Sequence, residues 1–186
     1  GNVRSVLFAM ERLGQEAVLT AEPEIIRSAD KVIFPGVGEA STTMAYLKSS
    51  GLDILIPSLT QPVLGICLGM QLMCTHSEEN DTPCLNIFPQ EVKKFIPDAG
   101  HKVPHMGWNS LENIRPGSFL PTGMTGEYVY FVHSYYVEKG PYTAAVSNHT
   151  LPFSAAMQKD NFFATQFHPE KSGKAGEEVL KHFLKL

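Results

Sequence analysis

Hydrophobic and polar positions follow two different periods along this chain. Near the start, apolar residues recur every three or four positions, which predicts a helix that begins with the first residues and stops at Gly14. Short apolar runs then have the length of strands, at residues 17–20, 31–36 and 63–66. Helical stretches are expected around residues 24–28, 40–49 and 51–57, and from residue 68 to about 76.

The second half of the chain has a different pattern of hydrophobic residues. Its β-branched and aromatic runs are short and are separated by Pro, Gly and Asn, which is typical of antiparallel or mixed strands. An amphipathic helix closes the chain after residue 172. The sequence therefore predicts an α/β fold, with a mostly parallel central sheet flanked by helices and additional antiparallel strands in the C-terminal half.

Composition narrows the class of protein. The chain has 186 residues, 43% hydrophobic and 18% charged, which favours one globular domain over residues 1–186. A net charge of −4 and no basic run argue against a nucleic-acid partner, and no apolar run or leader indicates a membrane. Three cysteines without C-x-x-C spacing argue against a disulfide framework and predict a cytoplasmic protein.

Candidate chemistry centres on "GICLG" at residues 65–69, where Cys67 lies between two glycines at the end of a predicted strand. This is the form of a nucleophile elbow, in which a sharp strand-to-helix turn requires small neighbours. The start of the following helix favours a thiolate. The alternative is that Cys67 is a small buried hydrophobe; the elbow pattern favours the nucleophile. Cys74 and Cys84 lack such surroundings and are expected to be core or surface thiols.

A thiolate nucleophile needs a proton shuttle, and "FHPE" at residues 167–170 offers one. His168 and Glu170 are two positions apart at a strand end, so both side chains should point to the same face. A carboxylate that orients an imidazole completes a Cys–His–acid set. Taken alone, the segment favours a surface His-Pro-Glu turn, so its pairing with Cys67 is a hypothesis.

An acyl-transfer site also needs donors for an oxyanion, and the amide of Leu68 is the expected first one. The "PGVG" segment at residues 35–38 suits a backbone loop beside the elbow, although a plain strand-exit turn has equal weight on spacing alone. Cys74, His76 and Cys84 lack metal-ligand spacing, as do His101 and His105. No metal site and no cofactor are expected.

Taken together, these segments resemble the class I, triad-type glutamine amidotransferases. More narrowly, the chain is similar to the glutaminase subunits of imidazole glycerol phosphate synthase, which serve histidine biosynthesis. The resemblance spans nearly the whole chain in order and is carried by "FPGVG" (34–38), "GICLGMQ" (65–71), "PHMGWN" (104–109), "YFVHSYY" (130–136) and "QFHPEKS" (166–172).

The resemblance implies a role for each matching residue. Cys67 would attack the side-chain amide of glutamine, His168 would protonate the leaving ammonia, and Glu170 would orient His168. The implied oxyanion residues are Val37, Gly38 and Leu68. The implied glutamine-binding residues are Gly36, Gln71, Glu79, Ser134 and Tyr135.

The resemblance also implies a partner, a cyclase subunit with a (β/α)₈ barrel, to which ammonia is passed in a heterodimer. Asn2, Trp108, Tyr130 and Lys171 match the docking face. On sequence alone Trp108 reads equally as a core aromatic. Family members carry a strand of about 5–6 residues ahead of the position of Gly1, and we expect this chain to lack it.

Three other functions remain open at this stage. The nearest is a glutaminase that serves pyridoxal phosphate, anthranilate or nucleotide synthesis. A non-catalytic protein could keep Cys67 as a redox sensor, but such a thiol needs no aligned pair like His168 and Glu170. A cysteine peptidase is weakened by the lack of an obvious extended substrate groove in the sequence.

Overall fold

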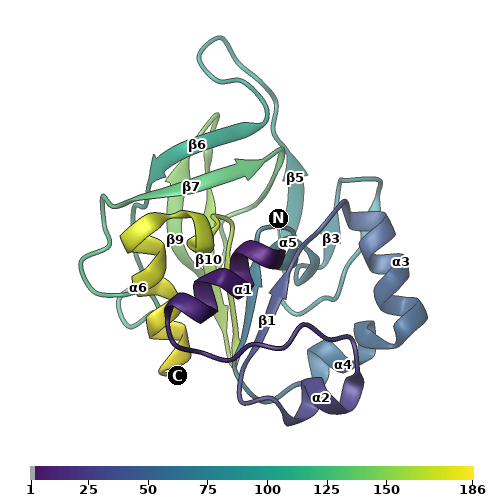
Figure 1. The fold of residues 1–186 in the computed structure, drawn as a ribbon. Helices are drawn as coiled ribbons and strands as arrows, with labels where there is room; N and C mark the ends of the chain where they lie inside the picture. The colour runs from purple at the N-terminus through teal and green to yellow at the C-terminus, as the bar shows by residue number, and fades with distance from the viewer. Residues whose placement is uncertain (1–2) are drawn as a thin grey trace.

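The computed structural model describes residues 3–186 and contains a central sheet of five strands in the order β1-β2-β11-β10-β9 (Figure 1). Three of them, β1 (Val32–Pro35), β2 (Val63–Ile66) and β11 (Phe162–Thr165), run parallel. The other two, β10 (Pro152–Lys159) and β9 (Thr143–Asn148), continue the sheet in antiparallel fashion. The predicted α/β class with antiparallel strands from the C-terminal half is confirmed.

Helices pack on both faces of this sheet (Figure 1). One core contains residues of α1 (Val3–Arg12) and α6 (Gly173–Leu184), and the other contains residues of α3 (Ala40–Ser50), α4 (Leu52–Ser58) and α5 (Leu68–Leu72). The short α2 (Pro23–Ser28) precedes β1. Side chains of β2 divide between the cores, because successive residues of a strand point to opposite faces: Val63 joins the second core, and Leu64 and Ile66 join the first.

Two smaller sheets flank the central one. A β6–β7 ribbon pairs β6 (His105–Ser110) with β7 (Tyr128–His133). After β11 of the central sheet, the chain passes through a short 3₁₀ turn, η1 (Pro169–Lys171), into α6. A four-stranded sheet has the order β4-β3-β5-β8. Its strands are β4 (Thr82–Pro83), β3 (His76–Ser77), β5 (Glu91–Lys94) and β8 (Tyr135–Val137).

The strand expected at residues 17–20 does not form, and that prediction is wrong. Val18 and Leu19 lie in an irregular segment with about two thirds of their surface exposed (67% and 68%). β1 pairs with β2 and with no second strand among residues 3–186, so residues 17–20 have no neighbour to supply ladder hydrogen bonds. An apolar run does not become a strand without such a neighbour.

The helix expected from residue 68 to about 76 is also shorter than predicted, since α5 ends at Leu72. A later loop satisfies the carbonyls at its end: the amide of Leu85 donates to Leu72 O at 2.8 Å, and those of Ile87 and Phe88 donate to Met73 O at 2.8 and 2.9 Å. These tertiary bonds replace another helical turn and free His76–Ser77 to form β3.

Two further features concern the environment of the protein. Within residues 3–186, the structure contains no helix of the length and hydrophobicity needed to cross a lipid bilayer. Cys67, Cys74 and Cys84 are all free thiols. Burial raises the pKa of the Cys74 and Cys84 thiols, so both favour the protonated form.

The packing of α6 yields a stability prediction. Phe183 is fully buried against Phe163, so Phe183→Ala should lower the free energy of unfolding by about 3–5 kcal/mol through lost burial and a residual cavity. Urea denaturation measures this change. Ile54, with 76% of its surface exposed, is the control, and Ile54→Ala should stay within about 0.5 kcal/mol of the parent. Similar effects for both variants would contradict the assignment of α6 to the core.

Candidate active site

The backbone at Cys67 lies in a region that side-chain-bearing residues avoid, with φ 54° and ψ −108°. Cys67 connects β2 directly to α5, and its amide donates to Thr165 O on the neighbouring β11 at 2.8 Å. The residue is buried, with 8% of its surface exposed. These observations give the turn the geometry expected of a nucleophile elbow.

The glycines on either side of Cys67 provide steric clearance. A Cβ atom on Gly65 would lie 2.8 Å from the sulfur of Met73, and one on Gly69 would lie 1.9 Å from the carbonyl oxygen of Phe34. The second contact is with backbone, which cannot rotate away. The start of α5 therefore packs directly against the end of β1, as only glycine allows.

His168 and Glu170 form a buried pair beside the elbow. Nδ1 of His168 lies 2.7 Å from Oε1 of Glu170, and only 1% of either side chain is exposed. The other ring nitrogen, Nε2, is buried and has no hydrogen-bond partner among the described residues, and the Cys67 thiol lies close enough to change the pKa of the ring. The structure thus brings together the three residues predicted to be catalytic.

The charge state of His168 follows from these neighbours. Burial by itself lowers the pKa of the imidazole, but Cys67 and Glu170 outweigh burial and raise it from 6.5 to about 9. The imidazolium is therefore the dominant form at neutral pH, next to the thiol. A cation in that place favours a thiolate.

The predicted oxyanion residues also lie at the elbow. Leu68 is the first residue of α5, where a helix does not use its own amides. A Cβ atom on Gly36 would lie 2.1 Å from Cβ of Leu68, so the loop after β1 touches the elbow. Val37 is exposed, its carbonyl accepts a 3.1 Å hydrogen bond from the Thr43 hydroxyl, and Gly38 has φ 91°.

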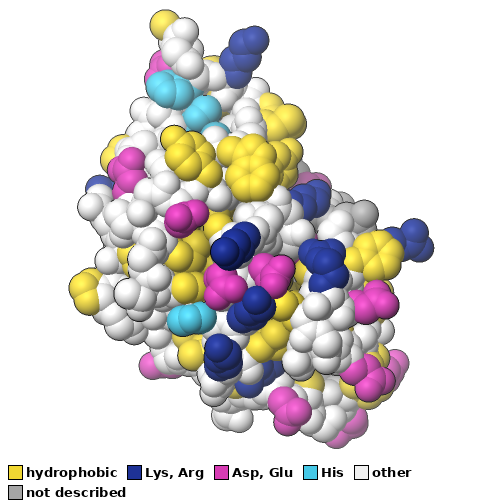
Figure 2. All heavy atoms as spheres, turned by 60° about the vertical axis from the view of Figure 1, so that its left-hand side comes forward, with side chains coloured by type: hydrophobic (Ala, Val, Ile, Leu, Met, Phe, Trp, Pro, Cys, Tyr) yellow, Lys and Arg dark blue, Asp and Glu magenta, His cyan; other side chains and the backbone are white. Residues whose placement is uncertain are grey.

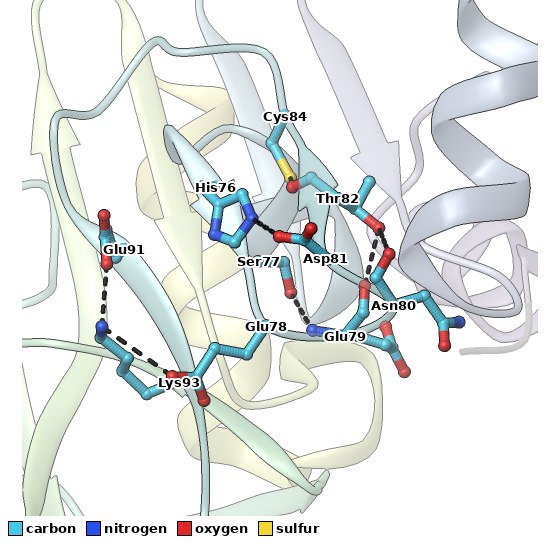
Figure 3. Close-up of polar contacts among 10 residues, drawn as sticks. All are labelled: His76, Ser77, Glu78, Glu79, Asn80, Asp81, Thr82, Cys84, Glu91 and Lys93. Carbon is cyan, nitrogen blue, oxygen red and sulfur yellow. Dashed lines mark hydrogen bonds and ion pairs between the residues drawn. The ribbon is translucent and has the colours of Figure 1, made fainter.

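Glu79 lies on the loop between β3 and β4, which Figure 3 shows with its neighbours. Its amide donates to the Ser77 hydroxyl at 3.2 Å, and its Oε2 accepts from the amide of Ala40 at 2.9 Å. Burial raises the pKa of this carboxyl, and the charge of Glu39 adds to the effect. Glu79 therefore ties its loop to the first residue of α3, just after the loop of residues 36–38.

Two of the remaining predicted glutamine-binding residues are tied to the elbow or to Glu79: Gln71 lies in α5, just after Cys67, and Tyr135 lies near Glu79. Ser134 and Tyr135 lie where β7 ends and β8 begins, and burial followed by the charge of Glu79 raises the pKa of the Tyr135 hydroxyl. Gln71 is buried in α5 and its amide donates to the Tyr135 carbonyl at 2.9 Å. Gln71 thus joins the β7–β8 junction to the helix that follows the elbow.

The predicted docking residues lie on one face of the molecule, with the exception of Asn2, which lies outside the described residues. Trp108 is 55% exposed and packs edge-on against Tyr130, so it is a surface aromatic. On the face drawn in Figure 2, hydrophobic side chains lie above charged side chains of both signs. Lys171 lines a cavity of about 240 Å³ together with Glu170 and Arg12.

One residue at the site was missed by the sequence interpretation. Gln166 is fully buried, and its amide nitrogen lies 3.6 Å from the sulfur of Cys67. The available signal was its place two positions before His168, but Gln166 and Phe167 form a bend after β11 ends at Thr165, so strand alternation could not predict where its side chain points. Among residues 3–186, no group of three or more His, Cys, Asp or Glu residues could hold a metal ion.

Comparison with known proteins gives the following similarities. The family model described as glutamine amidotransferase class-I matches residues 11–186. The imidazole glycerol phosphate synthase subunit HisH of Bacteroides thetaiotaomicron is 62% identical over all of this chain and 95% of its own length. The subunit of the same name from Idiomarina loihiensis is 48% identical over all of this chain and 93% of its own.

Solved structures share the fold at low identity. A crystal structure of a glutamine amidotransferase has a TM-score of 0.73 at 19% identity, covering all of this chain and 93% of that one. A putative GMP synthase protein from Thermoplasma acidophilum has a TM-score of 0.71 at 18% identity, covering all of this chain and 88% of that one. At such identities the likeness concerns the fold alone.

The backbone strain at Cys67 can be measured directly. Glycine tolerates φ 54° without a Cβ penalty, so Cys67→Gly should be more stable than Cys67→Ala by about 1 kcal/mol in urea denaturation. Cys74 is a matched control because its φ is not positive. There the order should reverse, with Cys74→Gly less stable than Cys74→Ala by about 0.5–1 kcal/mol. The same order at both positions would argue against strain.

The raised pKa of His168 can also be tested. In the native protein the imidazole should remain protonated until the pH rises through about 9. Cys67→Ala removes the largest interaction that raises this pKa, so titration should move toward acid by about one unit or more. Histidine-selective NMR titration measures both values. A native His168 that titrates near 6.5 would show that burial outweighs its two partners.

Proposed function

Because this chain belongs to the class-I glutamine amidotransferase family, we propose that it hydrolyses glutamine to glutamate and ammonia at Cys67. We propose further that it acts as the glutaminase subunit of an imidazole glycerol phosphate synthase in histidine biosynthesis. The relatives named as HisH subunits of that synthase support this assignment, since they match the chain over its whole length.

The family assignment confirms the resemblance drawn from the sequence motifs. It also confirms the prediction that the protein is an enzyme of the glutamine amidotransferase type. Identities of 46–62% over nearly the full chain favour the HisH group over glutaminases that serve other pathways. The roles of individual residues are our proposal and rest on their geometry.

The observation that carries the proposal is the buried His168–Glu170 pair, whose imidazole interacts with the thiol held in the strained turn at Cys67. In the first step the thiolate attacks the side-chain carbonyl carbon of glutamine and forms a C–S bond. The carbonyl electrons move onto oxygen, which becomes an oxyanion. The imidazolium of His168 then gives its proton to the amide nitrogen, and the C–N bond breaks to release ammonia and leave a glutamyl thioester.

The second step regenerates the enzyme. Water attacks the thioester while His168, now neutral, takes a proton from it. The C–S bond breaks, glutamate leaves, and Cys67 returns as a thiolate opposite a protonated imidazole. Glu170 holds Nδ1 of His168 throughout, so that Nε2 always faces the reacting atoms.

Recognition of glutamine is assigned to the residues gathered around the elbow. The carboxylate of Glu79 suits the substrate's ammonium group, and Ser134 and Tyr135 are assigned as further polar contacts. Both N–H groups of the Gln71 amide are used inside the protein, on Tyr135 O and Gln166 Oε1, so its oxygen is the atom available to substrate. Gly36 keeps the loop close to the thiol.

Oxyanion stabilisation is assigned to the amide of Leu68 and to the loop at Val37 and Gly38. The glycines on both sides of Val37 let a peptide rotate at low steric cost. We propose that this loop turns its amides toward the substrate only when the partner has bound its own substrate, which would prevent wasteful release of ammonia.

The proposed partner is a cyclase subunit with a (β/α)₈ barrel, forming a heterodimer with this chain. Exposed Trp108, the adjacent Tyr130 and Lys171 would form the docking face. Asn2, which lies outside the described residues, is proposed as a docking residue from the resemblance alone. Aromatic side chains are common anchors at such interfaces. We also propose that residues 1–186 act as one glutamine amidotransferase domain in the cytoplasm, in line with their three free thiols.

Glutaminase assays test this function. Ammonia release from glutamine should rise about tenfold or more when the cyclase and its phosphoribosyl substrate are added. Cys67→Ala should lower kcat by about 10⁴-fold or more, while Cys84→Ala, which changes a thiol outside the elbow, should retain activity. Equal rates with and without the cyclase would contradict gating, and an active Cys67→Ala variant would contradict the nucleophile.

A further inference from the structure

A continuous series of hydrogen bonds leads from Asn109 to the sulfur of Cys67. The half nearer to Cys67 begins at the backbone carbonyl of Tyr135, which accepts from Nε2 of Gln71 at 2.9 Å. The same nitrogen donates to Oε1 of Gln166 at 3.0 Å, and Nε2 of Gln166 donates to the sulfur of Cys67 at 3.6 Å. The sulfur therefore receives an N–H group from a side chain outside the catalytic triad.

The Tyr135 carbonyl determines the orientation of both amides, because a carbonyl oxygen can only accept. The Gln71 atom facing it must be nitrogen. That nitrogen is also adjacent to the Gln166 amide, so the Gln166 atom facing it must be oxygen. The nitrogen of Gln166 is then left to face Cys67, and rotation of either amide by 180° would set two donors or two acceptors against each other.

The half of the series farther from Cys67 runs from Asn109 through His105 and His133 and ends on the same carbonyl. Nδ1 of His133 donates to Tyr135 O at 2.6 Å, so Nε2 of His133 must accept from Nδ1 of His105, at 2.8 Å. Nε2 of His105 accepts in turn from the amide of Asn109 at 3.2 Å. Every proton position in the series thus follows from one backbone oxygen.

Both imidazoles are held neutral, as this arrangement requires. Burial lowers the pKa of His133 to about 3 and that of His105 to about 4, and neighbouring imidazoles add to the effect. Aromatic rings enclose the pair: Phe95 lies edge-on to His133, and Phe131 stacks on His105. His105 and His133 each have only 5% of their surface exposed.

We propose that Gln166 is a positioning residue that stabilises the thiolate of Cys67 through its N–H group. His133 holds the Tyr135 carbonyl in place by donating to it, and this carbonyl fixes the orientation of the Gln166 amide through Gln71. A hydrogen bond to a charged group is stronger than one to a neutral group, so the N–H group of Gln166 favours thiolate over thiol. The proposal rests on the proposed role of Cys67 as the nucleophile. Its effect adds to that of His168, whose ring interacts with the thiol and with Glu170.

Alkylation of Cys67 by iodoacetamide, followed by mass spectrometry of its peptide across a range of pH, tests the proposal. Gln166→Met keeps a side chain of similar length without the donor, and should raise the apparent pKa of alkylation by about one unit. At a pH below the apparent pKa of the parent, the alkylation rate of Gln166→Met should be about tenfold lower than that of the parent. An unchanged pH profile would overturn the proposal.

Variants at His133 separate positioning from general packing. In His133→Asn the amide nitrogen takes the place of Nδ1 and can still donate to Tyr135 O, so the alkylation profile should stay near that of the parent. His133→Leu removes the donor and should shift the profile in the same direction as Gln166→Met. His149→Gln is the control, because His149 stacks on His105 but bonds to Lys102 O outside the series.

A measurement on the unaltered protein guards against variants that fail to fold. Nitrogen NMR should find the proton of His133 on Nδ1 and that of His105 on Nδ1 at neutral pH. Protons on Nε2 would overturn the arrangement. Neither the NMR nor the alkylation assay uses glutamine or a cyclase, so failure of this proposal is distinguishable from failure of the proposed glutaminase function.

Discussion

The site depends on the backbone turn at Cys67, which places a buried side chain in a conformation that costs about 1–3 kcal/mol. Such a turn persists only if its surroundings leave no alternative. The Cys67 amide is bound to Thr165 O on β11, and Gly69 packs onto the Phe34 carbonyl at the end of β1. Relaxing the turn would break a sheet hydrogen bond and push α5 into β1. The two neighbouring strands therefore hold the thiol in place at the elbow.

The same strands deliver the rest of the chemistry. β1, β2 and β11 are adjacent and parallel, so their carboxyl ends meet at one edge of the sheet. The loop of residues 36–38 follows the first, Cys67 the second, and Gln166 and His168 the third. Binding sites of open α/β sheets form at this edge for that reason. The β7–β8 junction supplies the Tyr135 carbonyl, which accepts from the Gln71 amide and from His133. This oxygen thereby fixes the orientation of the amides of Gln71 and Gln166 and the proton positions of His133 and His105.

Sequence patterns predicted most of the fold, and their errors have clear physical reasons. Residues 17–20 have the apolar run of a strand but no partner in the described chain, so their hydrophobicity produced no sheet. The helix after Cys67 was predicted too long, because its end is set by amides of residues 85–88, which no local pattern reveals. Trp108 could have been core or surface on sequence alone, and the β6–β7 ribbon places it outside.

By itself the sequence determined the elbow and the alternation that buries both faces of the sheet, because each is set by spacing of a few residues along one element. It also predicted that His168 and Glu170 lie together, but the reason was wrong: β11 ends at Thr165, and Glu170 reaches the imidazole from the 3₁₀ turn η1 and not by strand alternation. Only the tertiary structure decided that the His168–Glu170 pair meets Cys67 and that Gln166 donates to its sulfur. Residues about a hundred positions apart meet because β11 pairs with β2, and strand order is a long-range choice made by packing of the whole core.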